Sequence, residues 1–109
     1  MAVSENEKCR CLKEVPKLSR ILFSARELES KTRLMRLLSH PTRMQVLRIL
    51  SEKDVCVCVL CRLLKKSQPN ISQHLSKLKD NGIVGCYQRG KLVYYRISDP
   101  DVKATVKRI

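Results

Sequence analysis

Apolar residues through much of this chain recur with the 3.6-residue period of amphipathic helices. Near the N-terminus one such stripe predicts a single helix. Its members are Leu18, Ile21, Leu22, Ala25 and Leu28. Three more helices are predicted, over residues 32–38, from Pro41 to Leu50 and from Val55 to Leu64, and Asp54 suits the N-cap of the last. The first stripe is apolar enough that it must be covered, either by a second copy of the chain or by the chain's own core.

A helix with a polar outer face is predicted after a tight turn at residues 65–68. Pro69 suits its first turn, with Ser67 or Gln68 as the N-cap, and Gly82 suits the left-handed position at its end. Its buried stripe consists of Ile71, Leu75 and Leu78. We therefore expect the remaining side chains of this helix to face outward.

The period changes after Gly82. Residues 83–89 and 92–98 are β-branched and aromatic runs, and Gly90-Lys91 between them predicts a hairpin turn. Asp99 and Pro100 open a last short helix. Two helices joined by a short turn and followed by a basic hairpin describe a winged helix-turn-helix, so the fold class is mostly α with a β-hairpin wing.

The chain has 109 residues, enough for one small domain. We expect a flexible, cysteine-containing arm over residues 1–14 and a DNA-binding and dimerisation domain over residues 15–109. The start of the chain has no apolar segment typical of a secretory signal, and no apolar run is long enough to cross a bilayer. We therefore expect a cytoplasmic protein without a membrane partner.

The net charge of the chain indicates what kind of partner it binds. The formal net charge is +13, which favours a polyanion such as nucleic acid. The alternatives are a merely solvated surface or an acidic membrane, but no basic amphipathic segment stands apart from the core pattern. The few aromatic residues favour duplex DNA over single-stranded RNA. Paired carboxylates, a nucleophile–base motif and a Gly-rich phosphate loop are all missing from the sequence, so we do not expect an enzyme.

The predicted DNA contacts lie on the polar helix and at the hairpin tip. Asn and Gln can bond base edges in the major groove, whereas Ser, Lys and Arg can hold phosphates. The candidates are Gln68, Asn70, Ser72, Gln73, His74, Ser76, Lys77, Arg89 and Lys91. For His74, a packed and hydrogen-bonded side chain is the competing interpretation. For the two residues of the hairpin tip, the alternative is a pair of solvated charges.

The other candidate site comes from a cluster among the chain's six cysteines. Cys56, Cys58 and Cys61 fall within six residues, which favours metal or redox chemistry over a disulfide framework, although small buried apolar residues are the alternative. Three thiolates without a nearby His suit a soft, thiophilic ion. On a regular helix Cys58 and Cys61 share a face, but Cys56 and Cys58 point apart. We therefore expect an ion to gather all three only where the first helical turn is frayed or unwound by binding.

The remaining cysteines are a second C-x-C pair, Cys9 and Cys11, and Cys86 alone. The pair could supply further thiolates from the arm. Two cysteines that bind no ion are an equally well supported interpretation. Cys86 lies on a predicted strand and is expected to be a core residue.

The chain resembles the ArsR/SmtB family of metal-sensing winged-helix repressors over roughly residues 32–98. The resemblance rests on the segments HPTRMQVLRIL, DVCVCVLC, SQPNISQHLSKLKDNGIV and RGKLVYYRIS. The cysteine segment is similar to that of arsenite-responsive members, in which the cysteines matching Cys56, Cys58 and Cys61 bind As(III) or Sb(III). The resemblance implies a homodimer that represses a detoxification operon and leaves its operator DNA when the ion binds.

Two departures affect the choice of ion. The last helix, DPDVKATVKRI, has no His, so the family's zinc or cobalt site there should be absent. The arm pair is similar to that of cadmium- and lead-responsive members, although their arm spacing is wider. The resemblance thus implies arsenite first and Cd(II), Pb(II) or Zn(II) second. A thiol redox switch and a metal-buffering protein without a DNA role are the competing functions. For an ion-responsive repressor, we expect ion binding to deform residues 54–57. This deformation should tilt the helix with the polar outer face, which we call the reading helix, relative to the DNA groove.

Overall fold

A computed structural model describes residues 9–109. The structure divides into two compact units at Arg33 and Leu34, and each is described here by itself. Of the predicted arm, residues 1–8 lie outside the described part of the chain. No helix in the described part is both long and apolar enough to cross a membrane.

The N-terminal unit consists of short helical segments. They are η2 (Arg10–Glu14), α1 (Val15–Leu18), η3 (Ser19–Ile21) and the first residues of α2 (Ala25–Leu38). The single helix predicted through the Leu18–Leu28 stripe is therefore wrong, and the separate helix predicted over 32–38 is the second half of α2. The chain is extended at Leu22, and a new helix begins after it.

A capping box explains this break. The Glu27 N–H donates to Ser24 Oγ at 3.2 Å, and the Ser24 N–H donates to Glu27 Oε1 at 2.9 Å. This reciprocal pair satisfies two backbone donors at the start of α2, so a new helix begins there although the apolar stripe continues. The same hydrogen bonds lower the pKa of Glu27.

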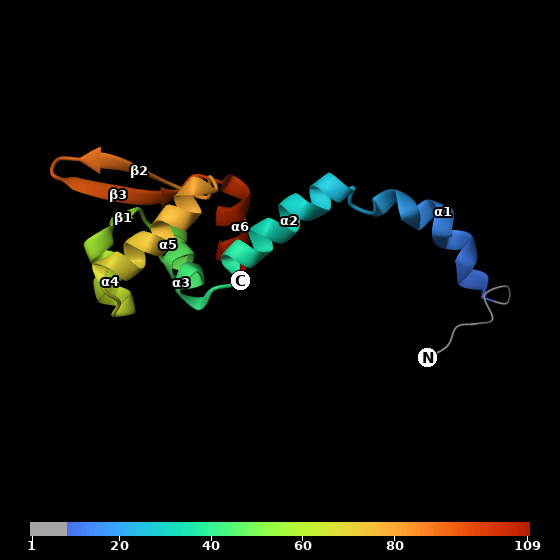
Figure 1. The fold of residues 1–109 in the computed structure, drawn as a ribbon, viewed down its shortest axis with the longest axis horizontal. Helices are drawn as coiled ribbons and strands as arrows, with labels where there is room; N and C mark the ends of the chain where they lie inside the picture. The colour runs from blue at the N-terminus through green and yellow to red at the C-terminus, as the bar shows by residue number, and fades with distance from the viewer. Residues whose placement is uncertain (1–8) are drawn as a thin grey trace. The chain divides into compact units, whose positions relative to one another are not determined.

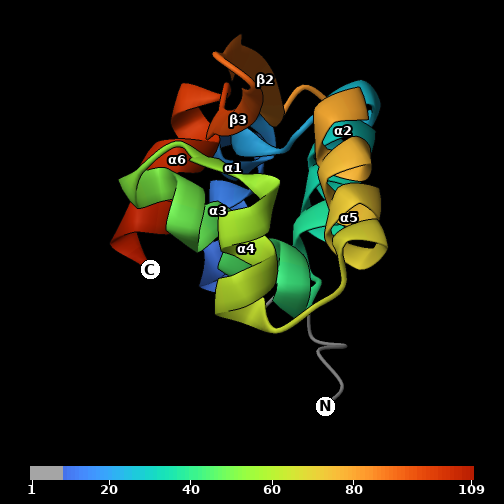
Figure 2. The same cartoon turned by 90° about the vertical axis from the view of Figure 1, so that its left-hand side faces the viewer.

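The C-terminal unit is a winged helix-turn-helix (Figures 1 and 2). Its further elements are α3 (Pro41–Glu52), β1 (Val55–Cys56), α4 (Val57–Leu64), α5 (Gln68–Asp80), β2 (Val84–Arg89), β3 (Leu92–Ile97) and α6 (Pro100–Arg108). Helix α4 packs against α5, and α3 packs against α6. The predicted fold class is thereby confirmed.

The core of this unit is made by the apolar faces of the helices together with apolar residues in and beside the hairpin strands. The largest of its fully buried apolar side chains are Leu47, Leu50, Leu60, Ile71, Leu75, Leu78 and Ile83. The three stripe residues predicted for α5 are all among them. The outer face of α5 is consequently left to polar side chains, as its pattern predicts.

Caps set the ends of these helices. His40, Ser67 and Asp99 cap α3, α5 and α6, and each helix has a proline at its first or second position. At the end of α5, the Ile83 N–H donates to the Leu78 carbonyl and the Gly82 N–H to the Lys79 carbonyl. This pattern needs a positive φ at Gly82, which is 74°. The start and end of α5 therefore follow from local signals.

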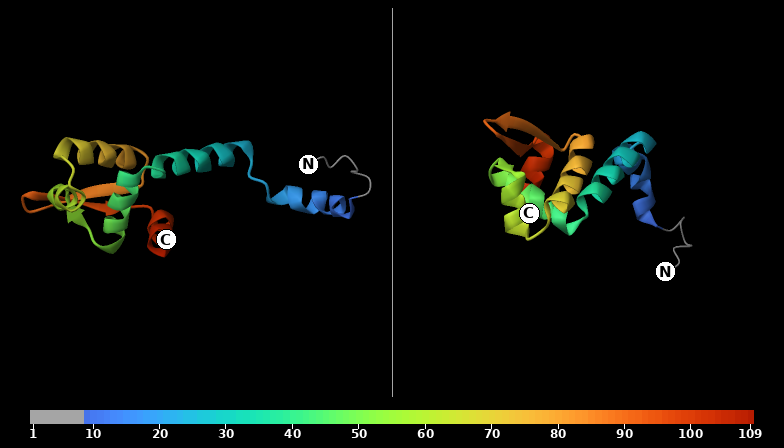
Figure 3. Two further views of the ribbon diagram at one scale, coloured as in Figure 1. Left: turned by 90° about the horizontal axis from the view of Figure 1, so that it is seen from below. Right: turned by 60° about the vertical axis from the view of Figure 1, so that its left-hand side comes forward.

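The sheet has the order β1-β3-β2, and β2 and β3 form the predicted hairpin (Figure 3). Strand β1 was not predicted. Its Val55 pairs with Tyr95 and its Cys56 with Tyr94. Because this pairing holds residues 55–56 extended, α4 begins only at Val57, with Cys56 as its N-cap. The helix predicted from Val55, with Asp54 as its cap, is therefore wrong in its first turn.

Candidate functional site

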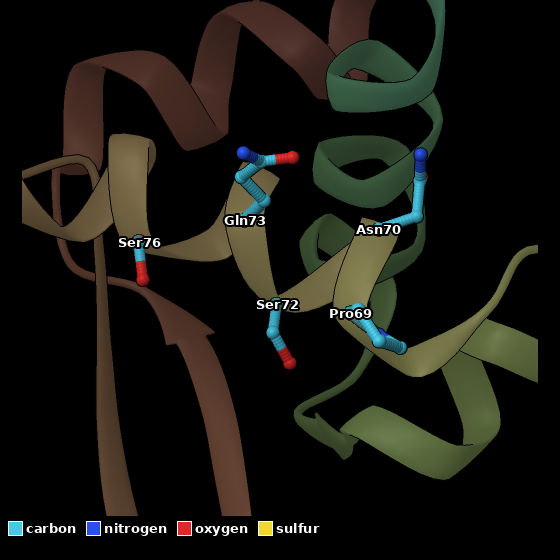
Figure 4. Close-up of a pocket in the computed structure, with 5 residues that line it drawn as sticks. All are labelled: Pro69, Asn70, Ser72, Gln73 and Ser76. Carbon is cyan, nitrogen blue, oxygen red and sulfur yellow. The ribbon is translucent and has the colours of Figure 1, made fainter.

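The candidate DNA-reading surface is the outer face of α5 (Figure 4). An open hollow of about 550 Å³ is lined entirely from this helix, by Pro69, Asn70, Ser72, Gln73 and Ser76. Figure 4 shows Asn70 and Gln73 on one side of the helix and the two serines on the other. Gln68 and Lys77 are also exposed on α5. Apart from His74, the α5 side chains that the sequence assigned to DNA contact thus lie on the accessible part of this helix.

His74 is the exception on this helix, because it is half-buried. Its Nδ1 accepts a hydrogen bond of 3.2 Å from Arg43 Nε, and its ring lies 4.4 Å from that of His40. The pKa of His74 is lowered by burial and by the positive charges of His40, Arg43 and Lys66. These contacts support the packed interpretation of His74 over a DNA contact.

The hairpin tip carries Arg89 and Lys91, both exposed. The Arg89 guanidinium lies 5.6 Å from the Tyr94 ring and 6.0 Å from the Tyr87 ring, close enough for cation–π contact. The two rings stack with 5.8 Å between their centres. Sequence reasoning missed these tyrosines. The signal was available, since a two-residue turn at Gly90-Lys91 places Tyr87 directly opposite Tyr94.

The cysteine site begins with a close pair. Cys56 Sγ and Cys58 Sγ are 2.8 Å apart, although the helical pattern predicted that they point apart. The difference arises because Cys56 lies before the helix, in extended backbone, where the i, i+2 geometry of a helix does not apply. Cys56 is buried, whereas Cys58 is exposed.

The hydrogen bond between the two sulfurs shifts both pKa values. The pKa of Cys56 is lowered, chiefly because the Cys58 thiol donates to its sulfur, and backbone N–H groups at the start of α4 act in the same direction against burial. The pKa of Cys58 is raised by the same hydrogen bond and by burial. Cys56 is therefore the sulfur of the pair that loses its proton more readily, and the thiolate is the form that binds soft ions.

The structure does not gather all the predicted ligands. Cys61 is half-buried and packs against the core from α4. Among residues 9–109, no three His, Cys, Asp or Glu side chains are grouped closely enough to hold a metal ion. Cys9 is half-buried and Cys11 exposed in the N-terminal unit, and Cys86 is half-buried on β2. Only Cys56 and Cys58 are therefore brought together.

Comparisons with known proteins assign the chain to a family. Residues 40–85, which include α4, the turn and α5, match the family described as bacterial regulatory protein, arsR family. An HTH-type transcriptional regulator of Methanocaldococcus jannaschii is 38% identical over 82 residues, covering 74% of this chain and 92% of that protein. The chain belongs to the ArsR family. Because this family consists of DNA-binding transcriptional regulators, the chain is not an enzyme.

Two ArsR relatives have named roles. The arsenical resistance operon repressor of Escherichia coli is 40% identical over 77 residues, which cover 70% of this chain. A homolog of the cadmium resistance regulatory protein CadC from Staphylococcus aureus is 36% identical over 77 residues and the same share of this chain. The matches span 65% and 64% of those two proteins, slightly less than two thirds of their lengths.

Solved structures agree on the fold. Reduced HlyU from Vibrio cholerae has a TM-score of 0.72 at 28% identity, covering 76% of this chain and 87% of that one. The homodimeric winged helix-turn-helix domain of a possible ArsR-family regulator from Mycobacterium bovis has a TM-score of 0.69 at 25% identity, covering 81% and 84%. Both neighbours support the assignment of α5 and the hairpin to a winged helix-turn-helix.

Proposed function

We propose that this ArsR-family chain is a metal(loid)-responsive repressor. It binds operator DNA as a homodimer and leaves it when a soft, thiophilic ion, As(III) or Sb(III), binds Cys56, Cys58 and Cys61. The observation that carries the proposal is the 2.8 Å sulfur pair at the start of α4, the helix that packs against the DNA-reading helix α5. Ion binding and DNA binding would therefore act on neighbouring elements.

The chemistry of the donors supports a soft ion. Two sulfurs are already together, a third lies one turn along α4, and thiolates select soft ions over hard ones. Cys61 would have to move toward the pair to complete a three-sulfur site. The names of the arsenic and cadmium relatives agree with this class of ion. The alternative inducers are Cd(II), Pb(II) and Zn(II), for which Cys9 and Cys11 would join the Cys56–Cys58 pair to give four ligands.

The homodimer is supported by apolar side chains that lack cover in the single chain. Those of residues 12–35 are exposed by between 45% and 75%: Leu12, Val15, Leu18, Ile21, Leu22, Phe23, Leu28 and Met35. A surface this apolar is typical of an interface, and a second copy of the chain is the partner we propose. The homodimeric neighbour from M. bovis supports the same assembly.

The test pairs ion binding with DNA release. A duplex selected by the reduced protein from a random library would serve as the operator, and anisotropy would follow its release during titration with sodium arsenite. Absorbance of thiolate-to-ion bonds would follow ion binding. We expect the parent protein to release the duplex. Cys58→Ser should bind it with near-normal affinity and fail to release it, whereas the control Cys86→Ser should behave as the parent. Normal arsenite-driven release by Cys58→Ser would refute the proposed site.

The arm cysteines are tested with the same assay. Cys9→Ser and Cys11→Ser should release the duplex normally if arsenite is the inducer. Failure of these variants to respond to cadmium chloride, while the parent responds, would instead support an arm-assisted cadmium site. In each variant, comparing duplex release by arsenite with release by cadmium chloride therefore distinguishes the two classes of ion.

A redox switch is the second candidate function, favoured by the same close sulfur pair. Hydrogen peroxide would oxidise the Cys56 and Cys58 thiols to a disulfide, with loss of two protons and two electrons, and would itself be reduced to two waters. DNA release by peroxide in the absence of any added ion, reversed by dithiothreitol, would favour this function. Retention of the duplex under peroxide would exclude it.

A further inference from the structure

The cysteine pair is connected to the wing through the sheet. Strand β1 pairs Cys56 with Tyr94 of β3, and Tyr94 pairs in turn with Tyr87 of β2. Residues directly opposite each other in antiparallel strands project from the same face, with side chains in contact range. Cys56, Tyr94 and Tyr87 therefore form one row across three strands.

A hydrogen bond ties the same segment to the wing a second time. The Tyr87 hydroxyl donates to Asp54 Oδ2 at 2.8 Å. Asp54 lies two residues before Cys56, so the wing is bound on both sides of Val55. Any movement of this short extended segment is consequently transmitted to the two tyrosines of the hairpin.

The tyrosines in turn position Arg89. Its guanidinium lies over both rings, which stack nearly parallel, with 16° between their planes. Arg89 is the arginine at the hairpin tip and one of the two basic residues there that we expect on the DNA backbone. Strand pairing of Cys56 with Tyr94, stacking of Tyr94 on Tyr87 and the cation–π contacts of Arg89 thus connect the cysteine to a predicted DNA contact.

The mechanics favour movement of β1 over movement of α4. An ion bound to both sulfurs would fix their separation at the value that its own bonds require, so binding would shift one sulfur relative to the other from the present 2.8 Å. Cys58 is part of α4, which is anchored by the fully buried Leu60. Cys56 is part of a strand of only two residues, and the pairing of that strand with β3 links its position to the hairpin.

We propose that ion binding at Cys56 and Cys58 reaches the DNA through the wing. The ion displaces Cys56 and β1, the Asp54–Tyr87 hydrogen bond carries that displacement to the Tyr87 ring, and Arg89 loses its place over the tyrosine rings. Tyr87 is a positioning residue in this device. The inference rests on the proposed ion-responsive function. It assigns the loss of DNA affinity to movement of the hairpin, whereas tilting of α5 through α4 is the competing route.

The decisive variant is Tyr87→Phe, which removes the hydrogen bond to Asp54 and keeps the ring beneath Arg89. Without ion, it should bind the selected duplex within about twofold of the parent and should bind arsenite normally. Allosteric effects are typically about 5–150-fold in affinity, and the arsenite effect should shrink by at least about threefold in this variant. Tyr95→Phe is the matched control, since Tyr95 is adjacent on β3 but projects from the other face, against the core.

A second variant approaches the same bond from the other side. Asp54→Ala should reduce the arsenite effect as Tyr87→Phe does, and the double variant should reduce it no more than either single substitution does. Asp54→Asn, whose amide oxygen can still accept from the hydroxyl, should restore the effect. This rescue distinguishes a broken bond from a general loss of structure.

Salt dependence identifies the output. If the wing is released, arsenite should reduce the slope of log affinity against log salt in the parent, and Arg89→Ala should already have the lower slope before arsenite is added. Loss of specific binding with an unchanged slope would assign the output to α5 and overturn the inference. So would an undiminished arsenite effect in Tyr87→Phe while the parent also responds. Absence of any response in the parent, to arsenite or cadmium chloride, would refute the proposed function itself.

Discussion

Arg89→Ala gives the sharpest measure of the wing's part in DNA binding. Arg89 is exposed at the hairpin tip, and its guanidinium lies 5.6 Å from the Tyr94 ring. At an exposed site this cation–π contact contributes about 0.5–1 kcal/mol. It therefore favours one position of the Arg89 guanidinium before DNA binds. If that charge neutralises one phosphate, its loss should reduce the slope of log affinity against log salt by about 0.9.

The slope converts into a measurable ratio. Between 50 and 200 mM salt the parent should lose about 3.5-fold more affinity than Arg89→Ala, on specific and random duplexes alike. Fluorescence anisotropy at four salt concentrations would resolve this difference. Arg89→Lys keeps the charge and should keep the slope, and Lys103→Ala on α6 should leave both slope and affinity unchanged. An unchanged slope in Arg89→Ala would show that this side chain does not contact the DNA backbone.

Three further outcomes are expected. Gln73→Ala should weaken specific duplex binding by about 1–3 kcal/mol and random duplex binding little; equal losses in a competition assay would make Gln73 a phosphate contact. Leu22→Lys places a charge in the proposed dimer interface and should give monomers by sedimentation velocity, and a folded dimer would refute that interface. Because the pKa of His74 is lowered from 6.5, the free energy of unfolding should be full above about pH 6.5 and fall as the pH drops through the lowered pKa. Urea unfolding of His74→Gln should lack that part of the pH dependence.

The sequence by itself determined the reading helix and the wing, because their signals are local. The stripe of Ile71, Leu75 and Leu78 sets which face of α5 is buried, and Ser67 and Gly82 set its ends. The two-residue turn after Arg89 sets the hairpin register. Each of these signals lies within a few residues of the element it specifies, so no distant partner is needed to read it.

The sequence contains a local signal for the beginning of α2, but a competing apolar pattern runs through the same residues. The Ser24–Glu27 capping box is a local signal, and the apolar stripe that runs through it predicts an unbroken helix. The cap decides the outcome, because two satisfied backbone donors outweigh apolar periodicity on a segment whose side chains are all exposed. Periodicity alone does not distinguish a helix from two helical segments on either side of a cap.

Only the tertiary structure decided the geometry of the cysteine site. Cys56 is extended because its strand partner is Tyr94, which lies far along the chain, and Asp54 is drawn from a capping role to the Tyr87 hydroxyl. Residues 54–56 carry a pattern equally suited to the first turn of a helix. Strand pairing with the edge of the hairpin wins, because it satisfies backbone groups that the edge strand would otherwise expose. That choice brings two sulfurs together which helical spacing would have kept apart.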